Sequence, residues 1–145
     1  MIVNNDNYYM DIAKQVSELS TCLRRKVGAT LVKDGAGIAS GYNDMPQNCT
    51  RCSDVGCLRI ENSIPSGTRQ EMCRAVHAEQ SVLMYCVKFG ISAEGATMYV
   101  TTFPCSICAK LIIEAGIKRV VYSEGYPDDL SMQLFKESKV ELVKL

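Results

Sequence analysis

The hydrophobic pattern of the first part of the chain changes period once, from that of a helix to that of strands. One apolar face recurs at helical spacing and predicts an amphipathic helix over residues 6 to about 20. The residues of this face are Tyr9, Ile12, Ala13, Val16 and Leu19. The segments "VGATLVK" and "GIASGY" then flank Asp34-Gly35, a dipeptide that favours a tight turn between antiparallel strands. We therefore expect a helix followed by a β-hairpin.

The second half of the chain alternates between helical and strand patterns. We expect helices over about residues 76–88, 105–115 and 130–137, followed in turn by the strands "TMYVTT", "RVVYS" and "VELVKL". A helix, a hairpin and three helix-strand units imply an α/β fold with a five-stranded mixed sheet covered by helices. Ligands of such sheets bind beyond the carboxyl ends of the strands, often at helix N-termini.

Residues 44–73 interrupt this pattern with a polar stretch that contains glycine and proline. Its cysteines are Cys49, Cys52, Cys57 and Cys73. The stretch has no hydrophobic period, which indicates an insertion and not a core element. No repeat, low-complexity tract or linker divides the chain, so we expect residues 1–145 to form one domain that carries this insertion.

The charge balance bears on the kind of partner. Lys plus Arg and Asp plus Glu both number 16, so no global basic field attracts a nucleic acid, and a small substrate is favoured. The sequence shows no signal peptide and no apolar run long enough to span a bilayer, so we expect a cytoplasmic protein without a membrane partner. Cytoplasmic cysteines stay reduced, which favours metal ligands or buried thiols over disulfides.

The one histidine of the chain lies in a pattern of metal-binding residues. His77 and Glu79 fall at the start of one predicted helix, and Cys105 and Cys108 at the start of the next, after Pro104. Both pairs are therefore expected at the same edge of the sheet. Cysteines three apart share a helical face, and a helix N-terminus favours the thiolate form that binds metal.

One imidazole and two thiolates supply three ligands to a tetrahedral Zn²⁺ and leave the fourth position for water, as in catalytic zinc sites. Glu79 is placed to carry protons between that water and a leaving group. H-x-E followed by P-C-x-x-C is the pattern of zinc nucleobase deaminases. The alternatives are a structural zinc module without enzymatic activity, a redox Cys-x-x-Cys pair and ordinary core residues. Glu79 distinguishes a catalytic zinc site from a structural one, because a structural site has no use for an acid beside the metal.

With these residues placed, the sequence resembles the deoxycytidylate (dCMP) deaminases of the cytidine deaminase superfamily. The resemblance begins at about Cys22 and rests on "RRKVGATLV", "GYNDMP", "HAE", "FPCSICAKLIIEAGIKRVVYSEGYPDD" and the last strand. It implies a three-layer α/β/α fold and one zinc ion per active site. The implied enzyme is a zinc hydrolase acting on cyclic amidines, which converts dCMP to dUMP and ammonia and supplies dUMP for thymidylate synthesis.

The resemblance also implies roles for individual residues. The catalytic zinc ligands would be His77, Cys105 and Cys108. Glu79 would be the proton shuttle, and the backbone N–H of Ala78 would bond the base carbonyl. Asn43 would hold the sugar hydroxyl, the alternative being a turn-forming residue after a strand. Tyr126 would lie near the nucleotide, with core or turn packing as the alternative.

Insertions in some relatives carry a second zinc ion. Cys49, Cys52, Cys57 and Cys73 have the spacing C-x2-C-x4-C-x15-C, and four thiolates fit a closed structural site. The alternative is that one or two of them are buried thiols. We expect two zinc ions per chain.

Regulation and assembly are expected from the resemblance alone. It implies a homo-hexamer that dCTP activates together with Mg²⁺ and that dTTP inhibits. "RRKVGA" and "GYNDMPQNCT" match segments that line the effector site, which makes Arg24, Arg25 and Lys26 candidate effector contacts. The residue that binds the 5′-phosphate stays open between this basic cluster and Arg51, Arg69 and Arg74.

Two related enzymes are the alternatives to dCMP as the substrate. A tRNA adenosine deaminase shares HAE and PCxxC, but the neutral charge, the cysteine-rich insertion and the acidic "GYPDD" argue against an RNA partner. A free cytidine or deoxycytidine deaminase would need no phosphate contact.

Overall fold

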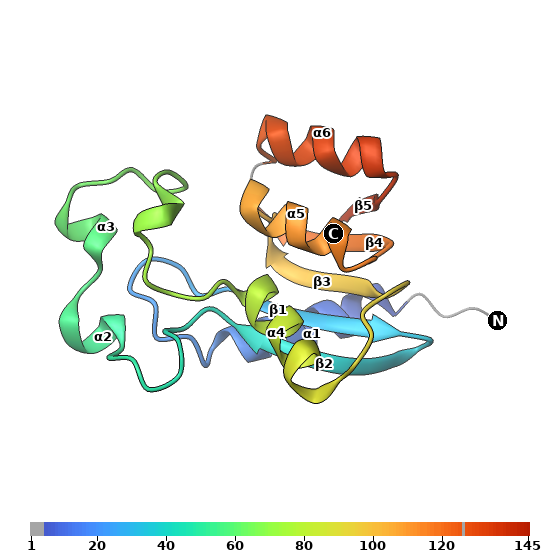
Figure 1. Ribbon diagram of the computed structural model, residues 1–145, viewed down its shortest axis with the longest axis horizontal. Helices are drawn as coiled ribbons and strands as arrows, with labels where there is room; N and C mark the ends of the chain where they lie inside the picture. The colour runs from blue at the N-terminus through green and yellow to red at the C-terminus, as the bar shows by residue number, and fades with distance from the viewer. Residues whose placement is uncertain (1–4, 126) are drawn as a thin grey trace.

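The computed structural model describes residues 5–125 and 127–145, and one five-stranded sheet organises them (Figure 1). The strands are β1 (Gly28–Lys33), β2 (Ala36–Tyr42), β3 (Thr97–Thr102), β4 (Arg119–Glu124) and β5 (Glu141–Lys144). They are ordered β2-β1-β3-β4-β5. β1 is antiparallel to both β2 and β3, whereas β3, β4 and β5 run parallel. The mixed sheet with parallel later strands confirms the predicted fold class.

The turn between β1 and β2 follows from its two residues. Asp34 has a φ of 51° and Gly35 a φ of 76°, so both lie in the left-handed region. A two-residue turn of this kind matches the twist of antiparallel strands and favours Asp-Gly. The predicted hairpin is confirmed.

Helices cover both faces of the sheet and make three layers. They are α1 (Asp6–Ser17), α4 (Ala78–Phe89), α5 (Ser106–Glu114) and α6 (Asp129–Ser138). α1 packs Met10 and Ala13 on one face, against Val32, Tyr99 and Val121. The opposite face is covered by α4, α5 and α6, which bury Val82, Ile112 and Phe135. No helix within the described residues is both long and apolar enough to cross a membrane.

Two helix ends differ from the prediction for identifiable reasons. α1 ends at Ser17, about three residues earlier than expected, and Ser20 leaves the helix to donate its hydroxyl to the carbonyl of Asn43 at 2.7 Å. α4 begins at Ala78, two residues later than expected, because Val76 pairs with Asp44 in an isolated β-bridge. Tertiary hydrogen bonds thus override the local helical pattern at both positions.

A buried ion pair fixes α1 to the sheet. Both carboxylate oxygens of Asp6 accept from the guanidinium of Arg119 at 2.8 and 2.7 Å, and Tyr99 donates its hydroxyl to Asp6 at 2.8 Å. The hydrogen bond from Arg119 holds the pKa of Asp6 below its usual range, although burial acts in the opposite direction. The ionised carboxylate is therefore the form that the folded protein prefers.

The insertion projects beyond the end of the sheet as a separate lobe (Figure 1). It contains three short helices that the sequence pattern does not predict, α2 (Cys52–Val55), α3 (Leu58–Glu61) and the 3-10 helix η1 (Gln70–Met72). Arg24 donates its Nη2 to the carbonyl of Ile64 at 2.5 Å, and Arg59 donates its Nε to the carbonyl of Thr68 at 3.1 Å. Arg24 therefore joins the lobe to the loop before β1, whereas Arg59 joins two segments within the lobe.

Candidate active site

Two helix N-termini meet beyond the carboxyl end of β3. His77 precedes α4 and is the residue at its N-cap, and its backbone N–H donates to Oε1 of Gln80 at 2.8 Å. Cys105 has the corresponding position before α5, and Cys108 lies in the first turn of that helix. The helix starts, which are fixed by apolar packing on the sheet, therefore place these three side chains at one edge.

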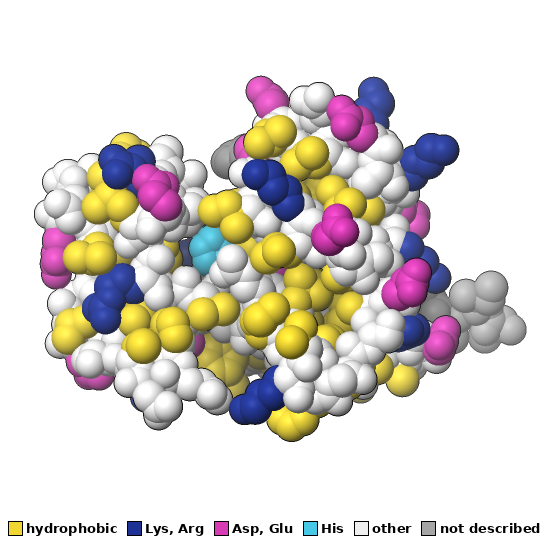
Figure 2. All heavy atoms as spheres, viewed as in Figure 1, with side chains coloured by type: hydrophobic (Ala, Val, Ile, Leu, Met, Phe, Trp, Pro, Cys, Tyr) yellow, Lys and Arg dark blue, Asp and Glu magenta, His cyan; other side chains and the backbone are white. Residues whose placement is uncertain are grey.

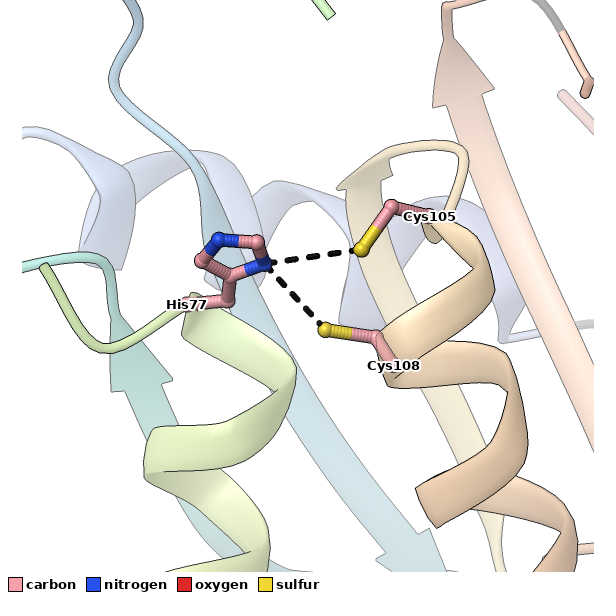
Figure 3. Close-up of side chains that lie close together, drawn as sticks. All are labelled: His77, Cys105 and Cys108. Carbon is pink, nitrogen blue, oxygen red and sulfur yellow. Dashed lines mark hydrogen bonds between the residues drawn. The ribbon is translucent and has the colours of Figure 1, made fainter. Parts of the chain in front are cut away.

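The three predicted ligands come together in space (Figure 3). Nδ1 of His77 lies 3.3 Å from Sγ of Cys108 and 3.6 Å from Sγ of Cys105. Within the described ranges, these side chains form the only group of three or more potential metal ligands whose atoms all lie within 4.8 Å of one another. One imidazole nitrogen and two sulfurs are a typical zinc donor set, so the chemistry of the group fits Zn²⁺.

Contacts within this cluster shift the pKa values of its members in opposite directions. A hydrogen bond with Cys108, and a further one with His77, lower the pKa of the Cys105 thiol to about 4 despite its burial. Hydrogen bonds with Cys105 and Cys73 raise the pKa of His77 to about 10. These shifts favour a protonated imidazole beside the thiolate of Cys105. Metal ligands bind in deprotonated form, so zinc binding releases protons here.

Glu79 lies in the first turn of α4, beside the cluster but outside it. Its side chain is 5% exposed, and its carboxyl oxygens do not belong to the group of ligand atoms. Burial raises the pKa of this carboxyl, and it hydrogen-bonds to the thiol of Cys108. A buried carboxyl next to an incomplete ligand set is suited to carrying a proton, because burial makes it hold a proton more readily than an exposed glutamate does.

A pocket opens over the cluster between the sheet edge and the insertion. Figure 2 shows the histidine side chain in the hollow between the two lobes. The predicted residues that line the pocket are Asn43, Ala78, Glu79, His77, Cys105, Cys73 and Arg25. Residues that the sequence patterns do not single out also line it, among them Cys22, Ser66, Gln70 and Phe103. Phe103 belongs to the motif that contains Cys105, whereas the fold brings Cys22, Ser66 and Gln70 here from segments that no ligand motif marks.

Ala78 and Asn43 contribute different groups to this pocket, a backbone N–H and a side-chain amide. Ala78 is fully buried at the first position of α4, where a backbone N–H has no partner within the helix. Asn43, directly after β2, accepts from the backbone N–H of Val27 at 2.8 Å and donates to the carbonyl of Arg25 at 2.8 Å. Its amide therefore holds the loop before β1 in place. The predicted Tyr126 lies outside the described residues.

The predicted basic cluster separates in the structure. Arg24 is bound to the insertion, as described above, and Lys26 lies 3.9 Å from the carboxylate of Glu18. Arg25 alone of the three lines the pocket. The loop thus directs three consecutive cations to three different environments.

The insertion cysteines do not form a closed cluster. Cys49 is exposed, whereas Cys52 is buried. Burial raises the pKa of Cys52, and the neighbouring thiols of Cys57, Cys22 and Cys73 raise it further. Cys22, which precedes the insertion in the sequence, is thus among the thiols that raise the pKa of Cys52.

Fold and site together define a class of protein: a three-layer α/β/α domain in which two helix N-termini present a zinc ligand set beside a buried acid. The family described as the cytidine and deoxycytidylate deaminase zinc-binding region matches residues 3–124. The chain belongs to this family.

Individual relatives agree with the family assignment. The chain is 39% identical over 136 residues to "ComE operon protein 2" of Bacillus subtilis, covering 93% of the chain and 68% of that protein. It is 40% identical over 121 residues to the deoxycytidylate deaminase of Mycobacterium phage D29, covering 81% of the chain and 92% of that enzyme. The crystal structure of dCMP deaminase from the cyanophage S-TIM5 in complex with dCMP and dUMP matches with a TM-score of 0.82 and 31% identity, over 100% of this chain and 99% of that one.

Proposed function

We propose that this protein hydrolyses dCMP to dUMP and ammonia. The observation that carries the proposal is the buried carboxyl of Glu79 beside a three-ligand zinc set at the base of a pocket. The relatives that are named deoxycytidylate deaminases, and the cyanophage enzyme that was crystallised with dCMP and dUMP, support the choice of substrate. The resulting dUMP is the precursor for thymidylate synthesis.

We assign the zinc to His77, Cys105 and Cys108, with a fourth position left for water. Zinc held there supplies a Lewis acid that makes water a nucleophile at neutral pH. The donor set, the spacing of the helix starts and the family model support this assignment.

Glu79 moves the protons of the reaction. Its carboxylate would take one proton from the attacking water and deliver it to N3 of the cytosine ring. It would then take the remaining proton from the new hydroxyl at C4 and deliver it to the amine, which leaves as ammonia while the C4 carbonyl forms. Burial raises the pKa of this carboxyl, so it holds a proton more readily than an exposed glutamate does. The backbone N–H of Ala78 is available to the carbonyl oxygen of the base.

The shape of the pocket favours a nucleotide over a tRNA. Ser66, Gly67 and Gln70 of the insertion line the same pocket as His77. We expect a pocket that the insertion partly covers to admit a small substrate more readily than a folded RNA loop. The non-enzymatic alternative, a structural zinc module, does not explain why the carboxyl of Glu79 is buried beside the ligand set.

We also infer a second, structural zinc site at the insertion, with Cys22 in place of the predicted Cys49. The support is that Cys22, Cys57 and Cys73 all interact electrostatically with buried Cys52, while Cys49 is exposed. Four thiolates make a closed tetrahedral site, and zinc binding would draw these sulfurs together and order the lobe.

Regulation and assembly are proposed on the resemblance, with one supporting feature. A cleft of about 980 Å³ lies against α4. The segment "GYNDMPQNCT" lines it with Tyr42, Asp44 and the residues that follow, and Arg51 and Lys88 line it as well. We propose that this cleft receives dCTP with Mg²⁺ or dTTP in a homo-hexamer. Arg24, Arg25 and Lys26 do not line it. We expect one deaminase domain that acts in the cytoplasm.

A comparison of three substrates tests the proposed function. Purified zinc-loaded protein would be assayed for ammonia release with dCMP, deoxycytidine and dCTP, each over a range of concentrations. We expect the highest kcat/KM for dCMP. A higher kcat/KM for deoxycytidine or dCTP, or no turnover of any of the three, would refute the proposal.

A further inference from the structure

The hydroxyl group of Thr102 is buried at the active-site pocket and has no protein partner. Within the described residues, two buried side-chain polar atoms form no hydrogen bond, Nη1 of Arg24 and Oγ1 of Thr102. Of these two residues, Thr102 alone lines the pocket that contains His77 and Glu79. A buried polar atom without a partner is unfavourable, because it has given up its hydrogen bonds to water. A hydroxyl in this state at a pocket wall is available to a ligand.

Strand β3 directs Thr102 to the face of the sheet that carries the active site. Side chains alternate along a strand, and Val100, two residues earlier, packs in the core that α4, α5 and α6 cover. Thr102 therefore lies on the same face, at the carboxyl end of β3 and three residues before Cys105. The backbone N–H of Phe103 donates to the carbonyl of Glu124 at 2.9 Å, which fixes the end of the strand.

The methyl group of Thr102 restricts the direction of its hydroxyl. A Cβ atom placed on Gly125 would lie only 3.0 Å from Cγ2 of Thr102, so this methyl group lies close against the glycine. Threonine is branched at Cβ, and its χ1 angle has few favourable values. The hydroxyl therefore lies on another side of Cβ than Gly125, and it cannot take the place of the methyl group without breaking that packing.

Two amide side chains along the pocket wall already have partners. Both polar atoms of the Asn43 amide are bonded to backbone groups of the loop before β1. Oε1 of Gln70 accepts from Nη1 of Arg59 at 3.4 Å. Among the described residues that line this pocket, Thr102 therefore supplies the buried side-chain oxygen that no protein group uses.

The cytosine ring has a group that needs such an oxygen. In the proposed reaction, the backbone N–H of Ala78 is available to the carbonyl oxygen of the base, and Glu79 serves N3. The amino group at C4 carries two N–H donors. The carboxyl of Glu79 can accept from one of them, which leaves the second without an acceptor. A threonine hydroxyl has two lone pairs that accept hydrogen bonds.

We infer that the hydroxyl of Thr102 accepts a hydrogen bond from the 4-amino group of the substrate. The inference rests on the proposed function and adds a residue that recognises the group which the reaction removes. Thr102 is thereby a specificity-determining residue, because a ring without an amino group at C4 leaves the buried hydroxyl unpaired.

The binding of two ligands to threonine variants tests this contact. The ligands are dCMP and the analogue in which hydrogen replaces the 4-amino group, so the pair differs in that group alone. The parent protein is zinc-loaded Glu79→Gln, which we expect to bind dCMP without appreciable turnover. Thr102→Val, Thr102→Ser and Thr101→Val would be made in this parent, and calorimetry would give the dissociation constants.

Thr101→Val is the matched control. The hydroxyl oxygen of Thr101 accepts from the backbone N–H of Gly28 at 3.2 Å. Because side chains alternate along β3, this neighbouring threonine lies on the opposite face of the sheet from the pocket. Its substitution removes a hydroxyl from the same strand without touching the ligand.

We expect Thr102→Val to weaken the binding of dCMP about 5- to 20-fold and to leave the binding of the analogue within about twofold of the parent. Valine keeps the shape of threonine and replaces the hydroxyl with a methyl group, so the difference between the two ligands reports the hydrogen bond. Thr102→Ser keeps a hydroxyl and should bind dCMP more tightly than Thr102→Val. Thr101→Val should bind both ligands as the parent does.

An unchanged affinity of Thr102→Val for dCMP would overturn the inference. So would an equal loss for both ligands, which indicates that the hydroxyl supports the pocket and does not contact the amino group. If Thr102→Val does not fold or does not hold zinc, Thr102→Ala is measured with the same two ligands, and a loss that is not selective for dCMP again overturns the inference. The proposed function fails separately, if the zinc-loaded wild-type protein releases no ammonia from dCMP.

Discussion

The two groups of cysteines in this protein differ in what holds them. His77, Cys105 and Cys108 lie at the starts of α4 and α5, whose buried faces pack on the sheet through Val82 and Ile112. Cys52, Cys57 and Cys73 lie in a lobe of short helices, and their sulfurs do not gather within the described structure. The packing of the core helices on the sheet positions the first ligand set. A set on a lobe needs the metal to bring it together.

His77→Ala should give the largest effect and act only on the first ligand set. Removing the one nitrogen ligand leaves two thiols, so we expect the loss of one zinc ion per chain and a fall of at least about a thousandfold in dCMP turnover. The melting temperature should change little, because packing and not zinc holds α4 and α5. Metal analysis and calorimetry measure both. A cooperative loss of folding together with the metal would remove the distinction between the two regions.

Asp6→Asn should disturb the sheet and leave the metal sites intact. It removes the charge that pairs with Arg119, and we expect the free energy of unfolding at pH 7 to fall by about 2 to 3 kcal/mol. The pKa of Asp6 is lower in the folded protein, so the wild-type stabilisation is complete above the ordinary value of about 3.9 and is lost as the pH falls through the folded value. Denaturant unfolding from pH 7 to pH 3 should show the two proteins converging. A constant difference over this range would contradict the account.

Cys52→Ser and Cys22→Ser should have the smallest effect on chemistry and act mainly on the lobe. We expect each to lose the second zinc ion and to lower the free energy of unfolding by about 1 to 2 kcal/mol, with kcat at saturating dCMP within about threefold of wild type. Cys49→Ser is the control, since this residue is exposed and is not among the thiols that shift the pKa of Cys52. If the zinc content falls in Cys49→Ser and not in Cys22→Ser, the proposed ligand Cys22 is wrong. The ligand set is then the one that the spacing predicts, with Cys49.

Sequence reasoning succeeded where a short segment determines its own structure. Asp34-Gly35 fixes the hairpin, and Pro104 with Cys105 and Cys108 marks a helix start that meets the one beginning after His77. It failed where long-range contacts decide. Cys22 approaches Cys52, and Arg24 reaches Ile64, 40 residues away, across the insertion. The three adjacent cations Arg24, Arg25 and Lys26 look alike in sequence, and only the tertiary structure separates their environments.

The central claim is that Glu79 carries protons beside zinc and does not hold the metal. Glu79→Gln keeps the size and polarity of the side chain and removes its ability to exchange a proton. The decisive measurement is the zinc content and the dCMP turnover of this variant, determined on the same preparation. We predict full zinc content and a turnover lower by about a hundredfold to ten-thousandfold. Full zinc content with a turnover near that of the wild type would contradict the account.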